Sequence, residues 1–150
     1  MRVEGPKIKR VTARDVFGVP SEDEEQIMVM KWAELQMGRW PDLQWLYHIP
    51  NGGKRRRTEA ARFKAMGVKA GVPDLCLPVP KGGYHGLYIE MKRQEGGKLS
   101  KDQREWIEGL DKNGYCVLRC DGARQAIDVL EAYMWGRLKL RSGDECRFTT

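Results

Sequence analysis

Three side chains in the middle of the chain have the types and spacing needed for metal-assisted chemistry. The segment from Gly71 to Lys98 reads as two short strands, PDLCLPVP and GLYIEMKR, joined by a glycine-rich hairpin turn. Side chains alternate along a strand, so Glu90 and Lys92 project from one face, about 6 to 7 Å apart. Asp74 stands at the start of the other strand. If the two strands pair, Asp74 lies beside Glu90, and two carboxylates and an ammonium converge.

Such a group can hold a divalent metal ion and a water molecule. Mg²⁺ prefers oxygen ligands, usually one or two carboxylates with waters and substrate phosphates. A metal held by Asp74 and Glu90 would polarise a phosphodiester and lower the pKa of a bound water, and Lys92 would orient that water or offset developing charge. The alternative is structural: an E-x-K pair is commonly a solvated strand face, and an Asp after a Pro is commonly a turn residue. The occurrence of both motifs, the E-x-K pair and the Asp after a Pro, at one hairpin favours the chemical interpretation.

The motifs around these residues resemble a known family. Pro73-Asp74, a hairpin and then Glu90-Met91-Lys92 resemble the PD-(D/E)xK nuclease signature. The longer segments HIPNGGKRRR, ARFKAMGVKAGVPDLCLP and GLYIEMKRQEGGKLSKDQREW, in this order, are similar to the virus-type replication-repair nuclease (VRR-NUC) family in its small stand-alone phage or bacterial form. The resemblance extends from about residue 21 to residue 133.

This resemblance implies a fold and an activity. The fold is an α/β, restriction-endonuclease-like single domain with a mixed central sheet flanked by helices. The activity is that of a Mg²⁺- or Mn²⁺-dependent endodeoxyribonuclease, a hydrolase of phosphodiester bonds in DNA repair. Stand-alone members resemble junction-resolving enzymes, so a homodimer that cuts branched DNA such as a Holliday junction is expected, without an organic cofactor.

The resemblance also implies further site residues. The backbone carbonyl of Met91 is expected to be a metal ligand. A glutamate at the start of an E-x-x-x-Q/E pattern on the first helix is expected to join the metal site. Glu22 and Gln26 match this pattern, and Glu25 is the alternative glutamate. Gln103 is placed near the cleft, although its position in a predicted S-x-x-Q capping box explains it equally well.

The basic charge of the chain is concentrated in one segment. Residues 51–72 contain seven basic residues and one acidic residue, a net charge of +6 that equals that of the whole chain. A focused basic surface next to a glycine turn favours contact with a phosphate backbone over a merely solvated face. The predicted DNA-binding residues are Lys54, Arg55, Arg56, Arg57, Arg62 and Lys69.

Composition limits the protein class. A length of 150 residues with 41% hydrophobic and 32% charged residues suits one soluble domain. No apolar run approaches the roughly 20 residues of a membrane span, and the first residues do not form a secretory signal. The four cysteines have no zinc-site spacing. We therefore expect a protein of a reducing cytoplasm, in a bacterial cell or a phage-infected host.

The chain divides into three parts: a loosely ordered basic arm (1–20), a nuclease domain (21–138) and a polar tail (139–150). The expected order of elements is α-β-α-β-β-α-β-α. Helices are predicted from Ser21 to about residue 37, over 59–66, from Ser100 to about residue 113, and over 123–138. The apolar side expected for the first helix consists of Ile27, Val29, Met30, Ala33 and Met37. Strands are predicted over 44–49, in the two arms of the hairpin, and over 115–119. His48, in the first strand, is expected to pack rather than react.

Two other functions stay open from sequence. The protein could be a DNA-binding module that has lost catalysis, but none of the motif residues is replaced. It could be a sequence-specific restriction-type nuclease, but 150 residues leave little chain for an element that reads bases.

Overall fold

The computed structural model describes residues 18–50 and 57–139, with only the backbone of Arg57. Most of the predicted arm, the Asn51-Gly52-Gly53 turn with Lys54 to Arg56, and the tail from residue 140 therefore lie outside the described residues. The described elements are α2 (Glu22–Gln36), the 3-10 helix η1 (Pro41–Trp45), β1 (Tyr47–His48), α3 (Arg57–Ala65), β2 (Leu75–Leu77), β3 (Leu87–Lys92), α4 (Lys101–Lys112), β4 (Cys116–Asp121) and α5 (Ala123–Met134).

The four strands form one mixed sheet in the order β1-β2-β3-β4. The hairpin pairs β2 with β3 antiparallel, with Leu75 opposite Ile89 and Leu77 opposite Leu87. Strand β4 returns parallel to β3 after the crossover through α4, and Glu90 lies opposite Arg119. Glu90 and Lys92 therefore lie on β3, which has a neighbouring strand on each side.

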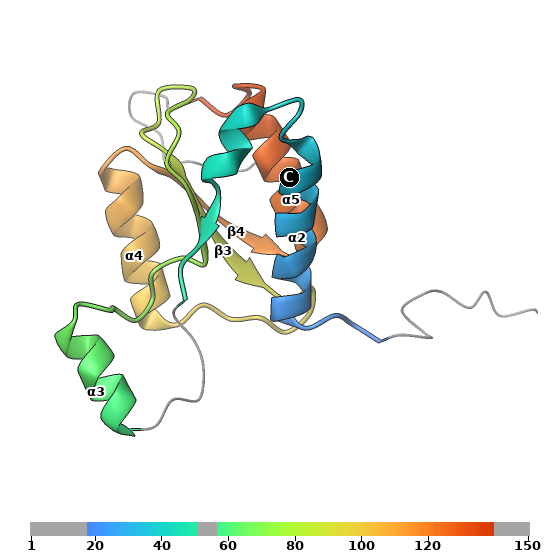
Figure 1. Cartoon of the computed structure of the whole chain (residues 1–150). Coiled ribbons are helices and arrows are strands. Elements are labelled where there is room, and N and C mark those ends of the chain that lie inside the picture. The colour runs from blue at the N-terminus through green and yellow to red at the C-terminus, as the bar shows by residue number, and fades with distance from the viewer. Residues whose placement is uncertain (1–17, 51–56, 140–150) are drawn as a thin grey trace, which may run out of the picture.

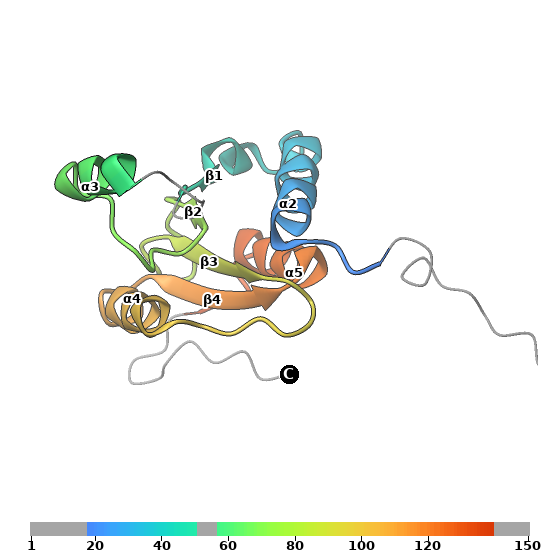
Figure 2. The ribbon, with the colours of Figure 1, turned by 90° about the horizontal axis from the view of Figure 1, so that it is seen from below.

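Helices cover both faces of the sheet, as predicted. Figure 1 shows α4 on one side and the adjacent pair α2 and α5 on the other, and Figure 2 shows the same layers from below. The core lies mainly between the sheet and the helix pair. Fully buried apolar side chains from β2, β3, α2 and α5 fill it, including Leu75, Ile89, Val29, Leu130 and Tyr133. Their burial removes apolar surface from water and fixes β3 against α2.

Capping chemistry sets where the helices begin. Ser21 and Glu24 form a capping box at the start of α2, and Ser100 and Gln103 form another at the start of α4, as the sequence predicted. In the loop before β2, Gly71 has a φ of +85°, and a Cβ there would lie 2.5 Å from the backbone of Asp102. Glycine thus lets this loop contact the first turn of α4, directly before Asp74.

Two local predictions were wrong. The strand expected over residues 44–49 is only Tyr47–His48, because Pro41 starts a 3-10 turn that extends to Trp45. The apolar side predicted for the first helix included Ile27, which is 52% exposed, whereas Val29 and Ala33 are buried. The apolar residues of α2 are spread around the helix, so their pattern did not define one face.

Helix α3 stands apart from the layered body in both views (Figures 1 and 2). Its described side chains are exposed apart from the partly buried Phe63. None of the helices in the described part of the chain has the length and apolar character that a membrane span requires.

Candidate active site

The hairpin brings Asp74 and Glu90 to the same end of β3. Because Leu75 is opposite Ile89 in an antiparallel pair, the residue before Leu75 comes opposite Glu90. Asp74 Oδ2 accepts a 2.8 Å hydrogen bond from the backbone N–H of Met91. This bond fixes the carboxylate of Asp74 beside the strand that carries Glu90 and Lys92.

Glu90 and Lys92 are buried, which excludes a solvated strand face. Glu90 is 1% exposed and Lys92 is 5% exposed. Lys92 Nζ donates to Glu90 Oε1 at 2.5 Å and to the carbonyl oxygen of Met91 at 3.0 Å. Removing two charges from water is unfavourable unless both are paired. This arrangement therefore indicates a site rather than a surface.

Gln103 has both of the roles that the sequence left open. Its Oε1 accepts from the N–H of Ser100 in the capping box, while its Nε2 donates to Glu90 Oε1 at 2.5 Å. Glu90 Oε1 is thus held by two donors, Lys92 and Gln103. The first turn of α4 thereby fixes the orientation of the Glu90 carboxylate.

The two glutamates proposed on the first helix have different positions. Glu22 is half-exposed, and its Oε1 lies 3.8 Å from Lys92 Nζ, at the edge of the site. Glu25 is buried and accepts 2.6 Å bonds from the N–H of Ala123 and from Gln94. The side chain of Gln26 is partly buried and forms no hydrogen bond within the described residues. Glu25 therefore caps α5, and of the two glutamates Glu22 is the one near Lys92.

This difference predicts that substitutions of the two glutamates change stability by different amounts. Glu25→Ala should lower the free energy of unfolding by about 2 to 3 kcal/mol, because it leaves the N–H of Ala123 unpaired and removes buried volume. Glu22→Ala should change it by less than about 1 kcal/mol, as expected for a partly exposed ion pair. Urea unfolding of both variants measures this. An equal loss of stability in the two would contradict the assignment of Glu25 as the capping residue.

His48 was predicted to pack in an apolar strand, and that prediction was wrong. The side chain is exposed, and Nδ1 lies 2.9 Å from the carbonyl oxygen of Asp74. The strand is short and lies at the sheet edge, so its side chains are not enclosed. The pairing of β1 with β2 places this imidazole next to the candidate site, which spacing in the sequence could not show.

Burial raises the pKa of both carboxyls. For Asp74 the rise is opposed by the Met91 N–H and by Lys92. Burial raises the pKa of Glu90 to about 7. The hydrogen bond from Lys92 opposes this rise, whereas the charge of Asp74 adds to it. Titratable groups with strongly perturbed pKa values cluster at functional sites.

The raised pKa of Glu90 predicts how metal binding depends on pH. A carboxyl group must lose its proton to bind a metal. Below pH 7 an ion therefore has to displace the proton of Glu90, and the affinity for metal should fall by up to about tenfold for each unit that the pH is lowered. The metal-free protein should also lose stability as pH rises from 4.5 to about 7, because folding favours protonated Glu90. The increase in melting temperature on adding Mn²⁺ should therefore be larger at pH 8 than at pH 6. An equal increase in melting temperature at pH 6 and pH 8 would contradict this prediction.

The residues present fit a divalent cation. Glu90 Oε2 is buried and is without a hydrogen-bond partner in the described structure. The ammonium of Lys92 already contacts the Met91 carbonyl, one of the oxygens expected to bind metal. No group of three or more His, Cys, Asp or Glu side chains arranged for a metal occurs in residues 18–50 and 57–139. The chain therefore offers two carboxylates and one carbonyl, a set that suits Mg²⁺ with waters and phosphate oxygens completing its shell.

The predicted DNA-binding residues are only partly described. Arg62 on α3 and Lys69 in the loop after it are exposed. Lys54, Arg55 and Arg56 lie outside the described residues, as does the side chain of Arg57.

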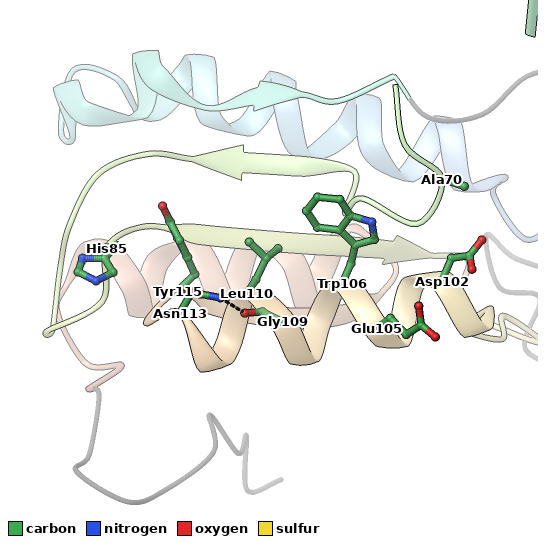
Figure 3. A pocket seen from close by; sticks show the side chains of 9 residues that line it. All are labelled: Ala70, His85, Asp102, Glu105, Trp106, Gly109, Leu110, Asn113 and Tyr115. Atoms are coloured by element: carbon green, nitrogen blue, oxygen red, sulfur yellow. Dashed lines mark hydrogen bonds between the residues drawn. The ribbon is translucent and has the colours of Figure 1, made fainter. Parts of the chain in front are cut away.

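A separate groove lies along α4. It has a volume of about 610 Å³, and Figure 3 shows Trp106 and Leu110 projecting from α4 into it, with Tyr115 beyond them. Asp102 and Glu105 lie at the N-terminal end of the helix. Because the groove is apolar with a negatively charged end, it does not suit a phosphate backbone. Its lining contains neither carboxylate of the candidate metal site.

Comparison with known proteins identifies the family of the chain. The VRR-NUC domain family matches residues 20–124. A solved structure described as a VRR_NUC domain protein has 38% sequence identity and a TM-score of 0.68, over 78% of this chain and 90% of its own. A search of curated proteins found no match. The matched range contains both arms of the hairpin, α4 and β4. The chain therefore belongs to the VRR-NUC domain family, a family of nucleases.

Proposed function

We propose that the protein is a Mg²⁺- or Mn²⁺-dependent endodeoxyribonuclease that hydrolyses phosphodiester bonds, with Asp74, Glu90 and Lys92 at its catalytic centre. The observation that carries this proposal is the convergence of Asp74, Glu90, Lys92 and the Met91 carbonyl at one end of β3. Glu90 is buried and paired with the ammonium of Lys92 without an evident structural purpose, whereas the other buried acid of the described residues, Glu25, caps α5.

Each residue has a role that follows from its contacts. A bound ion would polarise the phosphodiester and lower the pKa of a bound water. Asp74 and Glu90 would hold that ion together with the Met91 carbonyl, and Gln103 keeps Glu90 oriented through Oε1, leaving Oε2 free. Lys92 would position the attacking water and offset negative charge in the transition state. Glu22 would complete the shell from α2, directly or through a water.

We further propose a branched substrate and a homodimer. Family membership supports DNA as the substrate, and exposed Arg62 and Lys69 support contact with phosphates. A two-fold dimer would present two catalytic centres to a symmetric four-way junction and give paired nicks. These proposals place the protein where its DNA substrates are, in the cytoplasm of a bacterial or phage-infected cell.

The competing functions have less support. A binding module without catalysis would not need a buried Glu90 whose second oxygen is unpartnered. A restriction-type nuclease would need an element that reads base edges. Apart from α3, the described helices and strands form the sheet or the layers that cover it.

A cleavage assay tests the proposal. A labelled four-way junction and a linear duplex of equal length are incubated with the protein and Mg²⁺, Mn²⁺ or EDTA. We expect cleavage only with metal, and faster cleavage of the junction. No cleavage of either DNA with any metal would favour the binding module, and equal cleavage of both would remove the branched-DNA proposal alone.

A further inference from the structure

Two arginines stack on one exposed tryptophan at the end of the molecule away from the candidate active site. Trp135 directly follows α5 and is 49% exposed. The guanidinium of Arg39 lies 4.7 Å from the centre of its ring, and that of Arg137 lies 5.8 Å from it. Arg39 also lies 4.7 Å from the ring of Trp40, which is 9% exposed. We call Arg39, Trp135 and Arg137 the arginine clamp.

The clamp is held in place by the core. The rings of Trp40 and Trp135 pack edge to face, with centroids 5.5 Å apart and planes at 89°. Trp40 in turn contacts Trp32 of α2, with ring centroids 6.3 Å apart. The indole of Trp135 is thus a fixed platform although half of it is exposed. Stacking on this platform orders the two guanidinium groups before any ligand binds.

Both arginines are exposed, and neither has a carboxylate partner within the described residues. Two other exposed arginines do have carboxylate partners: Arg119 pairs with Asp121, and Arg124 pairs with Asp128. A guanidinium that stacks on a ring keeps its in-plane N–H donors available for hydrogen bonds. Those donors form a planar fork that matches a phosphate.

The helix dipoles explain part of this arrangement. Arg39 follows the C-terminal end of α2 and Arg137 follows that of α5, where positive charge is favourable. The dipoles do not require two guanidinium groups on the same ring. Both guanidinium groups lie near the same ring centre, so their like charges repel each other, and an anion that contacts both would reduce that repulsion.

We propose that the arginine clamp is a second DNA contact, which binds the phosphate backbone away from the bond that is cut. This inference rests on the proposed function. Glu22 begins α2 near the candidate active site and Arg39 follows its other end, and Figure 1 shows the helix running the height of the domain. Its 15 residues span about 22 Å. Phosphates of one duplex strand are spaced about 3.4 Å along the helix axis, so a duplex that lies along α2 would bring a phosphate roughly six nucleotides from the scissile bond to the clamp.

Binding of a 24-base-pair duplex or a junction, measured by fluorescence anisotropy at several salt concentrations without divalent metal, tests the clamp. Arg39→Ala with Arg137→Ala should weaken binding about tenfold and reduce the slope of log K against log salt by about 1 to 2, as expected for one or two lost phosphate contacts. Trp135→Leu keeps both charges but loses the platform, and should weaken binding by a smaller factor. Arg124→Ala removes an exposed arginine of equal charge on α5, and should leave affinity and slope unchanged.

Circular dichroism establishes that each variant is folded. If the double variant does not fold, Arg137→Ala alone should lower the slope by about 1, because its side chain is exposed. Unchanged affinity and slope in a folded variant would overturn the clamp while leaving the nuclease proposal intact. An equal loss in Arg124→Ala would also overturn it, since general charge would then explain binding. A wild-type protein that binds no DNA would instead overturn the proposed function.

Discussion

Asp74→Asn should reduce DNA cleavage by about a thousandfold or more while leaving the fold and DNA binding intact. Asparagine has nearly the same shape, and its amide oxygen can still accept the hydrogen bond from the N–H of Met91. The charge that would bind metal is lost. Lewis-acid stabilisation by a bound metal is worth several kcal/mol, and about 4 kcal/mol corresponds to a thousandfold in rate.

The measurement is single-turnover cleavage of a junction with saturating protein and Mg²⁺, together with anisotropy of the same DNA in EDTA. Asp128→Asn is the matched control, because Asp128 is an exposed carboxylate on α5 that pairs with Arg124. It should cleave at the wild-type rate. Cleavage by Asp74→Asn within tenfold of wild type would remove Asp74 from the catalytic centre.

Lys92→Ala should slow cleavage by about 100- to 1000-fold, the effect typical of removing one group that stabilises transition-state charge. Its effect on metal binding should have the opposite sign to that of Asp74→Asn. In the described structure the ammonium contacts Glu90 and the Met91 carbonyl and lies near Glu22. Without it these oxygens are less neutralised, so Mn²⁺ should bind more tightly than to wild type.

Calorimetric titration with Mn²⁺ at pH 8 measures this difference directly. Lys92→Arg keeps the positive charge but places a larger, planar group at a position that is only 5% exposed, and it should also cleave slowly. If Lys92→Ala lost metal affinity as Asp74→Asn is expected to, Lys92 would act by supporting the ligands rather than the reaction.

The sequence was informative where local chemistry decides structure. The alternation of GLYIEMKR, the capping residues Ser21 and Ser100 and the glycine-rich turn each act over a few residues, and the elements they predict are present. It was less informative in the segment from Trp40 to Ile49, where a proline-initiated turn replaced half of the expected strand. The sequence did contain a signal that Glu25 is buried. It lies four residues before Val29 and eight before Ala33, so the three side chains share one face of α2.

By itself the sequence determined the family, the element order and the three residues at the centre of the proposed chemistry, because motif spacing and strand period need no knowledge of distant contacts. Only the tertiary structure placed Glu22 near Lys92 and Glu25 at the start of α5, brought His48 beside Asp74, joined Gln103 to Glu90 and brought Arg39 and Arg137 onto one indole. Each of these depends on the packing of elements far apart in the chain. Such packing is set by the summed burial of many side chains, which no short sequence pattern records.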